Sequence, residues 1–227
     1  MNELTPYLTK LQGFEIVLVG LGLGILLIIV EILNRRSLLP PEFARKSIHI
    51  SAGILLATLP LFMTRPQVFL TNFAFLIGVI ILTGWLHIFN AVHAVKRWTI
   101  GEFLYPLSGV IISLAYDDMR VYTVSIMVLA LSDGLAGLFG RQYGGEGYKI
   151  WGGRKSLVGN AVFFLTTLFV LISFMLISIP NPSSAAWAIV VVGTLLLTCI
   201  EAFFGGGFDN LAVPLATSVI AYLLLTF

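Results

Sequence analysis

Charged residues are scarce in this chain. Of its 227 residues, 11% are charged and 58% are hydrophobic, and the mean hydropathy is +1.00. A soluble domain of this length needs far more polar surface, so the composition excludes one and indicates a membrane protein with several spans. The single cysteine, Cys199, lies in an apolar run, which excludes a disulfide framework and a thiolate metal site.

Long apolar runs fill most of the sequence, and a membrane-spanning helix needs roughly 20 such residues. We expect an all-α polytopic bundle that forms a single domain over residues 1–227. The first run lacks a basic n-region and a cleavage site, so we expect it to be retained. Its Gly20-x-x-x-Gly24 spacing predicts a close approach of another helix. Eight runs are predicted as transmembrane helices: 14–33, 47–64, 67–90, 100–116, 120–140, 157–179, 185–204 and 209–227.

The basic residues gather in three connections, at 34–46, 91–99 and 141–156. With eight spans, these connections fall on one side of the membrane, and the positive-inside rule makes that side cytoplasmic. Both termini are then expected on the other side. For a prokaryotic source, the location would be the cell membrane, with the active site on the cytoplasmic side.

Asp133 is the deepest carboxylate in the sequence. It lies about 12 Å below Arg141 at the helical rise of 1.5 Å per residue. On insertion scales, a carboxylate there costs about 2.5–3.5 kcal/mol, so it needs a cation, a metal or a water-filled cavity. An ion pair with a basic helix end is the simpler alternative. Gly137 and Gly140 lie near the same face, and either another helix packs there or a ligand reaches down to Asp133.

The loop 140–160 favours the ligand, because it is rich in glycine and in cations. Glycine lets backbone N–H groups approach an anion, and the next helix is expected to present its N-terminus at about Ser156. The loop is not a Walker A motif, since Gly153 stands where the lysine belongs. It predicts a polyphosphate site of another design, with a solvated positive-inside loop as the alternative. The polar residues that favour the phosphate site are Arg141, Lys149, Arg154, Lys155 and Ser156.

A second group of cations lies at 40–53, where two prolines start a helix. Arg45, Lys46 and His49 fall in its opening turns and share a face, which suits an anion. For His49, a hydrogen-bonded histidine at the membrane interface is an equally plausible alternative.

Further polar residues collect on the predicted cytoplasmic side, at the ends of the last two helices. Glu201 ends the seventh predicted helix, and Asp209 and Asn210 open the eighth. Taken alone, Asp209 would be read as a plain N-cap.

Together these segments resemble the CTP-dependent polyprenol kinase family, which includes dolichol kinases, phytol kinases and CTP-type diacylglycerol kinases. "RKSIH" (45–49) resembles the family's RK-x-x-H. "SDGLAGLFGR" (132–141) followed by "GGRKSLVGN" (152–160) resembles its nucleotide signature, D-x-x-A-x-x-x-G…K-[KR]-[ST]-x-x-G. "EAFFGGGFDNLAVP" (201–214) resembles its E…DN-x-x-x-P.

One departure from the family pattern concerns a glutamate. Many members have Glu-Gly-Ser where this chain has Val158, Gly159 and Asn160. If that Glu contributes to nucleotide or metal binding, this chain must supply the carboxylate elsewhere, and Glu146 is the substitute that the sequence offers.

The resemblance implies transfer of the γ-phosphoryl group of CTP to a primary alcohol embedded in the membrane. This chemistry needs a divalent metal, and Mg²⁺ prefers carboxylates and phosphate oxygens. Asp133, Asp209 and Glu201 are its candidate ligands. The candidate catalytic residues are Asp133, His49 and Asp209; the sequence does not choose between a carboxylate and His49 as the proton acceptor. Glu201 and Asn210 are candidates for the acceptor site. The candidate nucleotide- and phosphate-binding residues are Arg45, Lys46, Gly137, Gly140, Arg141, Gly153, Arg154, Lys155, Ser156 and Gly159.

Two other functions stay open at this point. Phosphatidate cytidylyltransferase belongs to the same superfamily, but its anionic acceptor needs extra cations, and this chain has no Lys or Arg after Lys155. An ion-coupled transporter would place its carboxylates near the midplane between inverted repeats, whereas here they lie toward one face. The expected substrates are CTP and a membrane lipid that is phytol, a polyprenol, dolichol or diacylglycerol. No nucleic-acid partner is expected, and a homodimer is left open.

Overall fold

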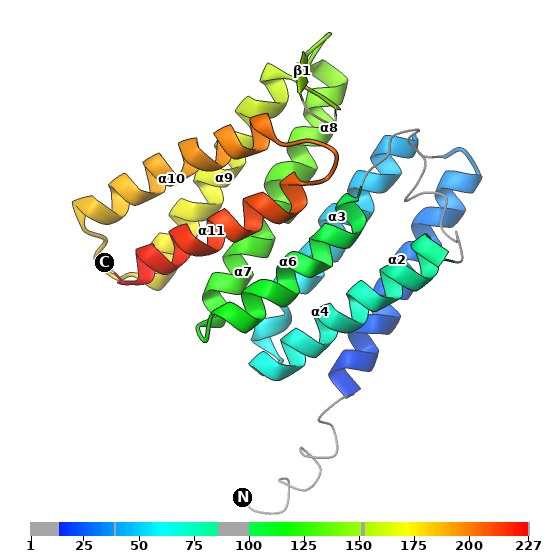
Figure 1. Cartoon of the computed structure of the whole chain (residues 1–227), viewed down its shortest axis with the longest axis horizontal. Helices are drawn as coiled ribbons and strands as arrows, with labels where there is room; N and C mark the ends of the chain where they lie inside the picture. Colours follow the sequence, from blue (N-terminus) through cyan, green and yellow to red (C-terminus); the bar gives the residue numbers. More distant parts are fainter. Residues whose placement is uncertain (1–13, 39, 86–99, 151–152, 227) are drawn as a thin grey trace, which may run out of the picture.

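The structure is a computed structural model that describes residues 14–38, 40–85, 100–150 and 153–226. The predicted basic connection at 91–99 and the end of the predicted helix 67–90 lie outside the described residues. The described part is an elongated bundle of helices, drawn in Figure 1.

The helices follow the predicted runs in order, so the all-α prediction is confirmed. Two π-helical segments extend or interrupt them: η2 (Ile80–Trp85) continues α4, and η3 (Leu129–Asp133) joins α7 to α8. The helix bounds in the described ranges are α2 Phe14–Arg35, α3 Pro41–Ala57, α4 Arg65–Val79, α6 Gly101–Ala115, α7 Met119–Val128, α8 Gly134–Tyr143, α9 Leu157–Ser178, α10 Ser184–Phe203 and α11 Asp209–Thr226, with a short 3-10 turn η1 at Leu59–Leu61.

Six continuous helices in the described ranges are long and apolar enough to cross a membrane. The other two predicted spans correspond to α3 and α6, which are shorter, at 17 and 15 residues. The protein therefore has the character of a multi-pass membrane protein. The assignment of the basic side to the cytoplasm stays a prediction.

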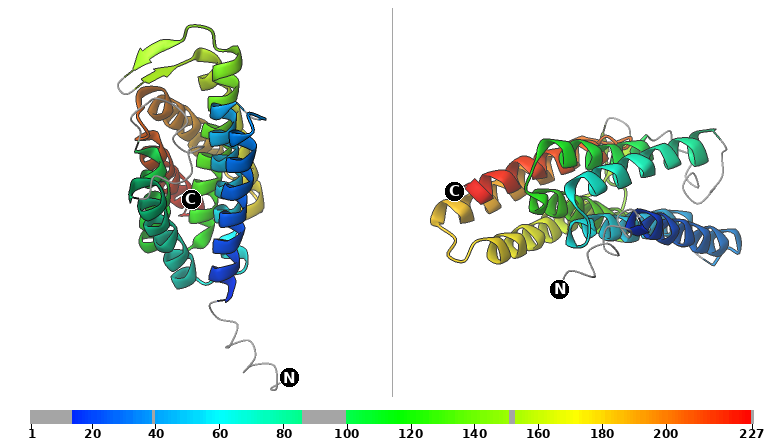
Figure 2. Two further views of the ribbon diagram at one scale, coloured as in Figure 1. Left: turned by 90° about the vertical axis from the view of Figure 1, so that its right-hand side faces the viewer. Right: turned by 90° about the horizontal axis from the view of Figure 1, so that it is seen from below.

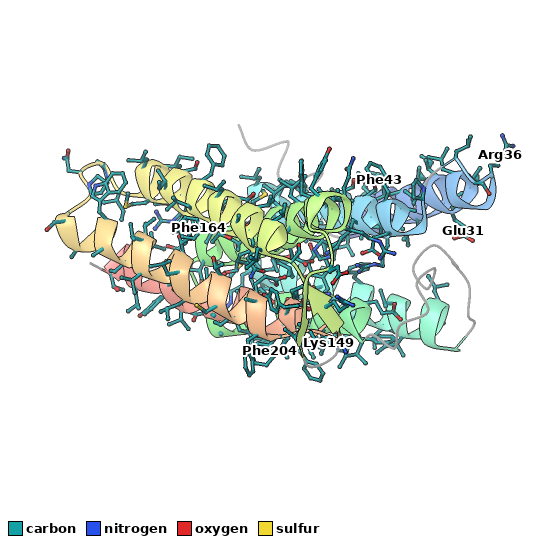
Figure 3. The ribbon with its side chains drawn as sticks, turned by 90° about the horizontal axis from the view of Figure 1, so that it is seen from above. Glu31, Arg36, Phe43, Lys149, Phe164 and Phe204 are labelled. Carbon is teal, nitrogen blue, oxygen red and sulfur yellow. The ribbon has the colours of Figure 1, made fainter. Side chains whose placement is uncertain are left out.

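The glycine-rich loop contains a small β-hairpin that the sequence analysis did not predict. Strand β1 (Tyr148–Ile150) pairs antiparallel with β2 (Gly153–Lys155). The hairpin extends past the helices at one end of the bundle, as the left view of Figure 2 shows. Lys149 is drawn on it in Figure 3. The hairpin is fixed to the end of α10, because the hydroxyl of Tyr148 donates to the carbonyl of Ala202 at 3.3 Å.

Two groups of helices form two apolar cores. The N-terminal half comprises α2, α3, α4 and α6, and the C-terminal half comprises α9, α10 and α11. The helix formed by α7, η3 and α8 runs between the halves and contributes side chains to both cores. This central helix is the most buried of the membrane-spanning candidates, with 67% of its apolar window inside the protein. A polar group placed on it faces protein rather than lipid.

Helix α8 meets α9 at two glycines. A Cβ built on Gly140 would lie 3.1 Å from the Cα of Gly159, and one built on Gly159 would lie 3.1 Å from the carbonyl oxygen of Ala136. In a bilayer, apolar area alone does not drive helices together, so small residues that permit close van der Waals contact stabilise such pairs. These two glycines join the central helix to the C-terminal half.

Candidate active site

The π-helical turn η3 places two acceptors beside His49 of α3. The Nε2 atom of His49 lies 3.1 Å from the main-chain oxygen of Leu129 and 3.1 Å from Oδ2 of Asp133. Both partners accept hydrogen bonds, so Nε2 must carry a proton, and a neutral ring then keeps its lone pair on Nδ1. Single π-helical turns within α-helices occur often at functional sites.

Asp133 is buried and paired with a lysine from the N-terminal half. The Nζ atom of Lys46 lies 2.9 Å and 2.8 Å from the two carboxylate oxygens of Asp133, and 3.0 Å from its main-chain oxygen. The ion pair that the sequence left as the simpler alternative is therefore present. Lys46 had been predicted to bind phosphate, and in this structure its ammonium group is held by Asp133.

The glycine face of α8 is covered by other helices, so the expectation that it lies open to a ligand is wrong. A Cβ on Gly137 would collide with the side chain of Lys46, and one on Gly140 would meet Gly159 and Ser156 of the α9 end. What reaches down this face to Asp133 is the side chain of Lys46. Gly137 leaves room for that lysine, and Gly140 leaves room for α9.

A second buried lysine comes from the hairpin. The Nζ atom of Lys155, at the end of β2, contacts the carboxylate of Glu201 and lies 2.8 Å from Oδ2 of Asp209. Burial alone would lower the pKa of Lys155, but Glu201, Asp209 and Asp133 together raise that pKa above its ordinary value. Lys155 therefore stays positively charged over the whole physiological pH range.

Three buried carboxylates meet between the two lysines. Asp133 of the central helix, Glu201 near the end of α10 and Asp209 at the start of α11 each offer one oxygen, and these oxygens lie within 4.8 Å of one another. The structure thus brings together the three predicted metal ligands. We name this group the carboxylate cluster.

The carboxylate cluster fits a divalent cation. In the described part of the chain, its three carboxylates share two lysine ammonium groups, Lys46 on Asp133 and Lys155 on Glu201 and Asp209. Among the described residues, Oε2 of Glu201 is buried without a hydrogen-bond partner. An unpaired carboxylate oxygen in a buried site is costly, and coordination of a hard cation is one way to satisfy it.

The predicted phosphate-binding arginines differ in exposure and in their partners. Arg141 is 57% exposed and lies 3.6 Å from Glu42, and Arg154 is exposed and donates to the main-chain oxygen of Glu146. Arg45 pairs with Glu42 at 2.7 Å. We name these three groups, which come from α3, α8 and β2, the rim guanidinium groups.

Ser156 caps α9, as predicted from its position before the helix. Its Oγ accepts from the backbone N–H of Gly159 at 3.0 Å. Gly153 lies in β2, and Gly159 is a packing glycine of α9. Glu146, which the sequence offered as a substitute for the missing family glutamate, is exposed in the turn before β1 and is not among the residues of the carboxylate cluster.

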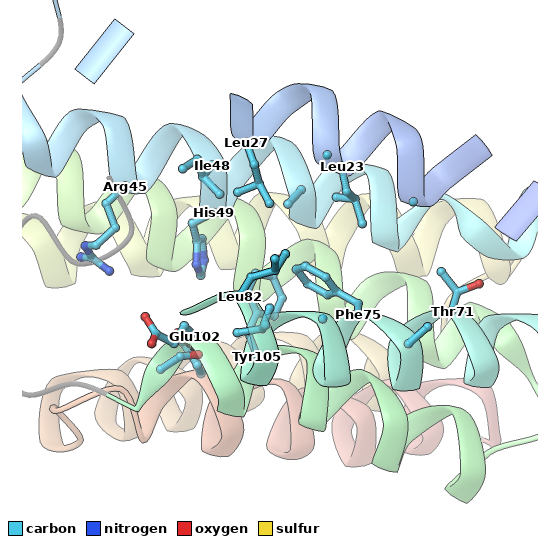
Figure 4. Close-up of a pocket in the computed structure, with 18 of the residues that line it drawn as sticks. Leu23, Leu27, Arg45, Ile48, His49, Thr71, Phe75, Leu82, Glu102 and Tyr105 are labelled. Carbon is cyan, nitrogen blue, oxygen red and sulfur yellow. Dashed lines mark hydrogen bonds between the residues drawn. The ribbon is translucent and has the colours of Figure 1, made fainter. Parts of the chain in front are cut away.

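A mostly apolar cavity of about 310 Å³ opens between α2, α3, α4 and α6. Its polar end contains Arg45, His49, Glu102 and Asn210, and Figure 4 shows the first three of these together at one end. His49 contacts Asp133, and Asn210 follows Asp209 in the chain, so this end adjoins the carboxylate cluster. Asn210 also donates to the main-chain oxygen of Gly101 at 2.9 Å.

Sequence reasoning missed the walls of this cavity. Tyr105 lies with its ring 4.7 Å from that of His49. Glu102 also lines the cavity, and no periodicity in the sequence marks either residue as part of a site. Gly20 and Gly24 were expected to bring another helix close, but both line the cavity instead, and a Cβ on either meets no described atom within 4 Å.

Comparison with known proteins finds relatives that are phytol kinases or probable phytol kinases. A phytol kinase of Synechocystis sp. is 31% identical, over 88% of this chain and 87% of that protein. Probable chloroplastic phytol kinases of Triticum aestivum and Zea mays are 28% and 26% identical, each over 94% of this chain and 77% of the relative. No family model matches the chain, and no solved structure gives a significant match. The length and identity of the first alignment show that the chain belongs to the polyprenol and phytol kinase family.

Proposed function

We propose that the protein is a kinase that transfers the γ-phosphoryl group of CTP to the hydroxyl group of a membrane lipid alcohol of the phytol or polyprenol type. Membership of the phytol kinase family supports the reaction class. The observation that carries the proposal is the carboxylate cluster beside the polar end of an apolar cavity. CTP as the donor is supported by the resemblance of the 132–160 segment to the family's nucleotide signature.

Asp133, Glu201 and Asp209 would hold Mg²⁺, which neutralises charge on the phosphate oxygens of the nucleotide. Lys46 and Lys155 fix the orientation of these carboxylates through the ion pairs described above. Because the carboxylates come from three different helices, their pairing with lysines from α3 and β2 holds the two halves of the molecule in register at the site.

The rim guanidinium groups have the chemistry to bind the phosphate chain. Arg45 lines the cavity, whereas Arg141, in the last turn of α8, and Arg154, in β2, are exposed. The N-terminus of α9, capped by Ser156, adds the partial positive charge of a helix end. Phosphoryl transfer depends mainly on such positioning and charge neutralisation.

His49 is the proton acceptor that the geometry favours. Its Nε2–H is held by Leu129 and Asp133, so Nδ1 keeps the lone pair, and the residue lines the cavity where a hydroxyl group would arrive. The hydroxyl oxygen attacks the γ-phosphorus, the bond to the β-phosphate oxygen breaks, and the hydroxyl proton passes to Nδ1. The products are a lipid monophosphate and CDP.

Purified protein in liposomes, incubated with γ-labelled CTP, Mg²⁺ and a panel of lipid alcohols, tests the proposal. The label should appear in a lipid monophosphate, with CDP released, and unlabelled ATP should compete poorly. His49→Gln should lower kcat by about 100-fold or more, the usual contribution of a positioned base, with little change in the KM for CTP. Release of pyrophosphate with phosphatidate as the productive acceptor would overturn the proposal in favour of a cytidylyltransferase. Uptake of an ion without phosphoryl transfer would favour a transporter.

A further inference from the structure

The cavity of the N-terminal half extends far beyond the site of phosphoryl transfer. Along α2 its lining runs from Leu27 to Ile16, a distance of about 16 Å at the helical rise. The hydrocarbon core of a bilayer is roughly 30 Å thick, so this is about the depth of one leaflet. In Figure 4 the residues along this path follow one another from His49 through Leu27 and Leu82 to Phe75 and Thr71.

Three glycines keep the cavity open. Gly20 and Gly24 of α2 and Gly78 of α4 line it, and a Cβ built on any of them meets no described atom within 4 Å. A glycine inside a helix destabilises it by roughly 0.5–1 kcal/mol relative to alanine. No described neighbour occupies the space that a side chain would take at these positions, so the glycines leave a volume that the described residues do not fill.

The shape and lining of the cavity indicate its occupant. Its walls are aliphatic and aromatic side chains, among them Leu23, Leu27 and Phe75, while its polar groups gather at the end beside the carboxylate cluster. A volume of about 310 Å³ lies at the lower limit of the roughly 300–1,000 Å³ typical of small-molecule sites. It suits one hydrocarbon chain rather than two.

We propose that this cavity binds the hydrocarbon chain of a single-chain lipid alcohol, with its hydroxyl group at His49 and Asn210, and that Gly20, Gly24 and Gly78 set the width of the chain that fits. The proposal rests on the proposed function for the reaction at the hydroxyl group. It assigns the acceptor specificity: diacylglycerol, with two chains on one glycerol, is a poor acceptor. The KM should fall as the chain lengthens to fill the cavity and then level off, because any further length stays in the bilayer.

Kinetics of cavity-filling variants provide the first test. Gly24→Leu and Gly78→Leu should each raise the KM for phytol at least about fivefold, because overpacking of a filled site costs about 1–3 kcal/mol. The KM for CTP should be unchanged, and short acceptors such as geraniol should be affected less than phytol. Ala188→Leu, which adds the same side chain to an exposed position of α10, is the matched control and should behave as wild type. An unchanged KM for phytol in both glycine variants, or efficient phosphorylation of diacylglycerol by the wild type, would overturn the proposal.

A second test needs no turnover. A phytol analogue with a photoreactive diazirine in its chain, incorporated into liposomes with the wild-type protein, should cross-link to α2 and α4, within 16–27 and 71–82. Gly24→Leu should abolish this labelling, and Ala188→Leu should retain it. Labelling confined to α9 and α10 would contradict the proposal. Labelling of α2 and α4 in a protein that phosphorylates no alcohol would support the cavity assignment and refute the proposed kinase function, so the two failures are distinguishable.

Discussion

The glycines that line the cavity of the N-terminal half and the glycines between the helices of the C-terminal half have opposite roles. In the C-terminal half, a Cβ on Gly193 of α10 would lie 2.9 Å from Ile220 of α11, and one on Gly159 would press on α8. In the N-terminal half, Gly20, Gly24 and Gly78 face open space. Glycines in the C-terminal half bring helices together, whereas those along the cavity hold volume open between helices.

The two halves also contribute different groups to the site. The C-terminal half supplies Glu201, Asp209 and, through the preceding hairpin, Lys155. Under the proposed function these groups must be held rigidly, because they would position a metal and phosphates. The N-terminal half supplies a cavity and His49, which suit a substrate that arrives from the bilayer. Asp133 stands on the central helix between them and contacts both sets of groups.

The largest loss of activity is expected for a substitution of Asp133, which lies between the two halves. Asp133→Asn removes the charge that pairs with Lys46 and the oxygen that orients His49, so turnover should fall at least about 100-fold, the scale for losing one group that stabilises the transition state. Transfer of label from CTP to lipid measures this. Asp117→Asn, at an exposed turn on the opposite end of α7, is the matched control and should retain activity. Near-normal turnover of Asp133→Asn in a folded protein would remove it from the site.

A smaller effect on activity is expected for Glu201→Gln, which tests the contribution of the C-terminal half to metal binding. Glu201→Gln keeps the shape of the side chain but weakens its unpaired oxygen as a metal ligand. The Mg²⁺ concentration for half-maximal activity should rise by about 10- to 100-fold, with activity recovered at high Mg²⁺. A Mg²⁺ titration of both proteins, after removal of metal with a chelator, provides the measurement. An unaltered Mg²⁺ requirement would mean that Glu201 only balances the charge of Lys155.

Thermal stability should separate the two kinds of glycine. Gly24→Ala fills open space and should leave the unfolding midpoint in detergent unchanged or slightly higher, since alanine favours the helix by roughly 0.5–1 kcal/mol. Gly193→Ala forces Ile220 aside and should lower the midpoint, because overpacking costs about 1–3 kcal/mol. Equal shifts of the unfolding midpoint in the two variants would contradict the distinction between cavity glycines and packing glycines.

Much of this arrangement could be predicted from the sequence. The runs of apolar residues identified the helices, because a bilayer imposes a length and a composition on each span. Asp133 stood out because a carboxylate is expensive within lipid. Glu201 and Asp209 were named as metal ligands through the family resemblance, and the structure brings the three together.

Other features depend on contacts between distant segments, which local patterns do not encode. The partner of Asp133 is a lysine 87 positions away, and the glycines of α8 that promised access to a ligand instead accommodate that lysine and α9. A glycine pair spaced by four looks the same in sequence whether a helix packs on it or a cavity lies beside it. Gly20 and Gly24 were misread for that reason. The hairpin at 148–155 is too short to show a strand pattern.

The smallest effect on activity is expected for Glu146, in the turn that precedes the hairpin. The family's missing glutamate suggested that Glu146 completes the nucleotide or metal site, but its side chain is exposed, and Arg154 bonds to its main-chain oxygen rather than its carboxylate. Substitutions at such surface positions usually change free energies by no more than about 0.5 kcal/mol, so Glu146→Gln should alter kcat/KM for CTP by about twofold at most. Assays of Glu146→Gln beside Glu201→Gln at limiting Mg²⁺ compare an exposed with a buried carboxylate on the same side of the site. A tenfold loss of kcat/KM for CTP in Glu146→Gln would contradict this expectation. It would mean that the hairpin folds over the bound nucleotide, so that the loop contributes to the site together with the carboxylate cluster.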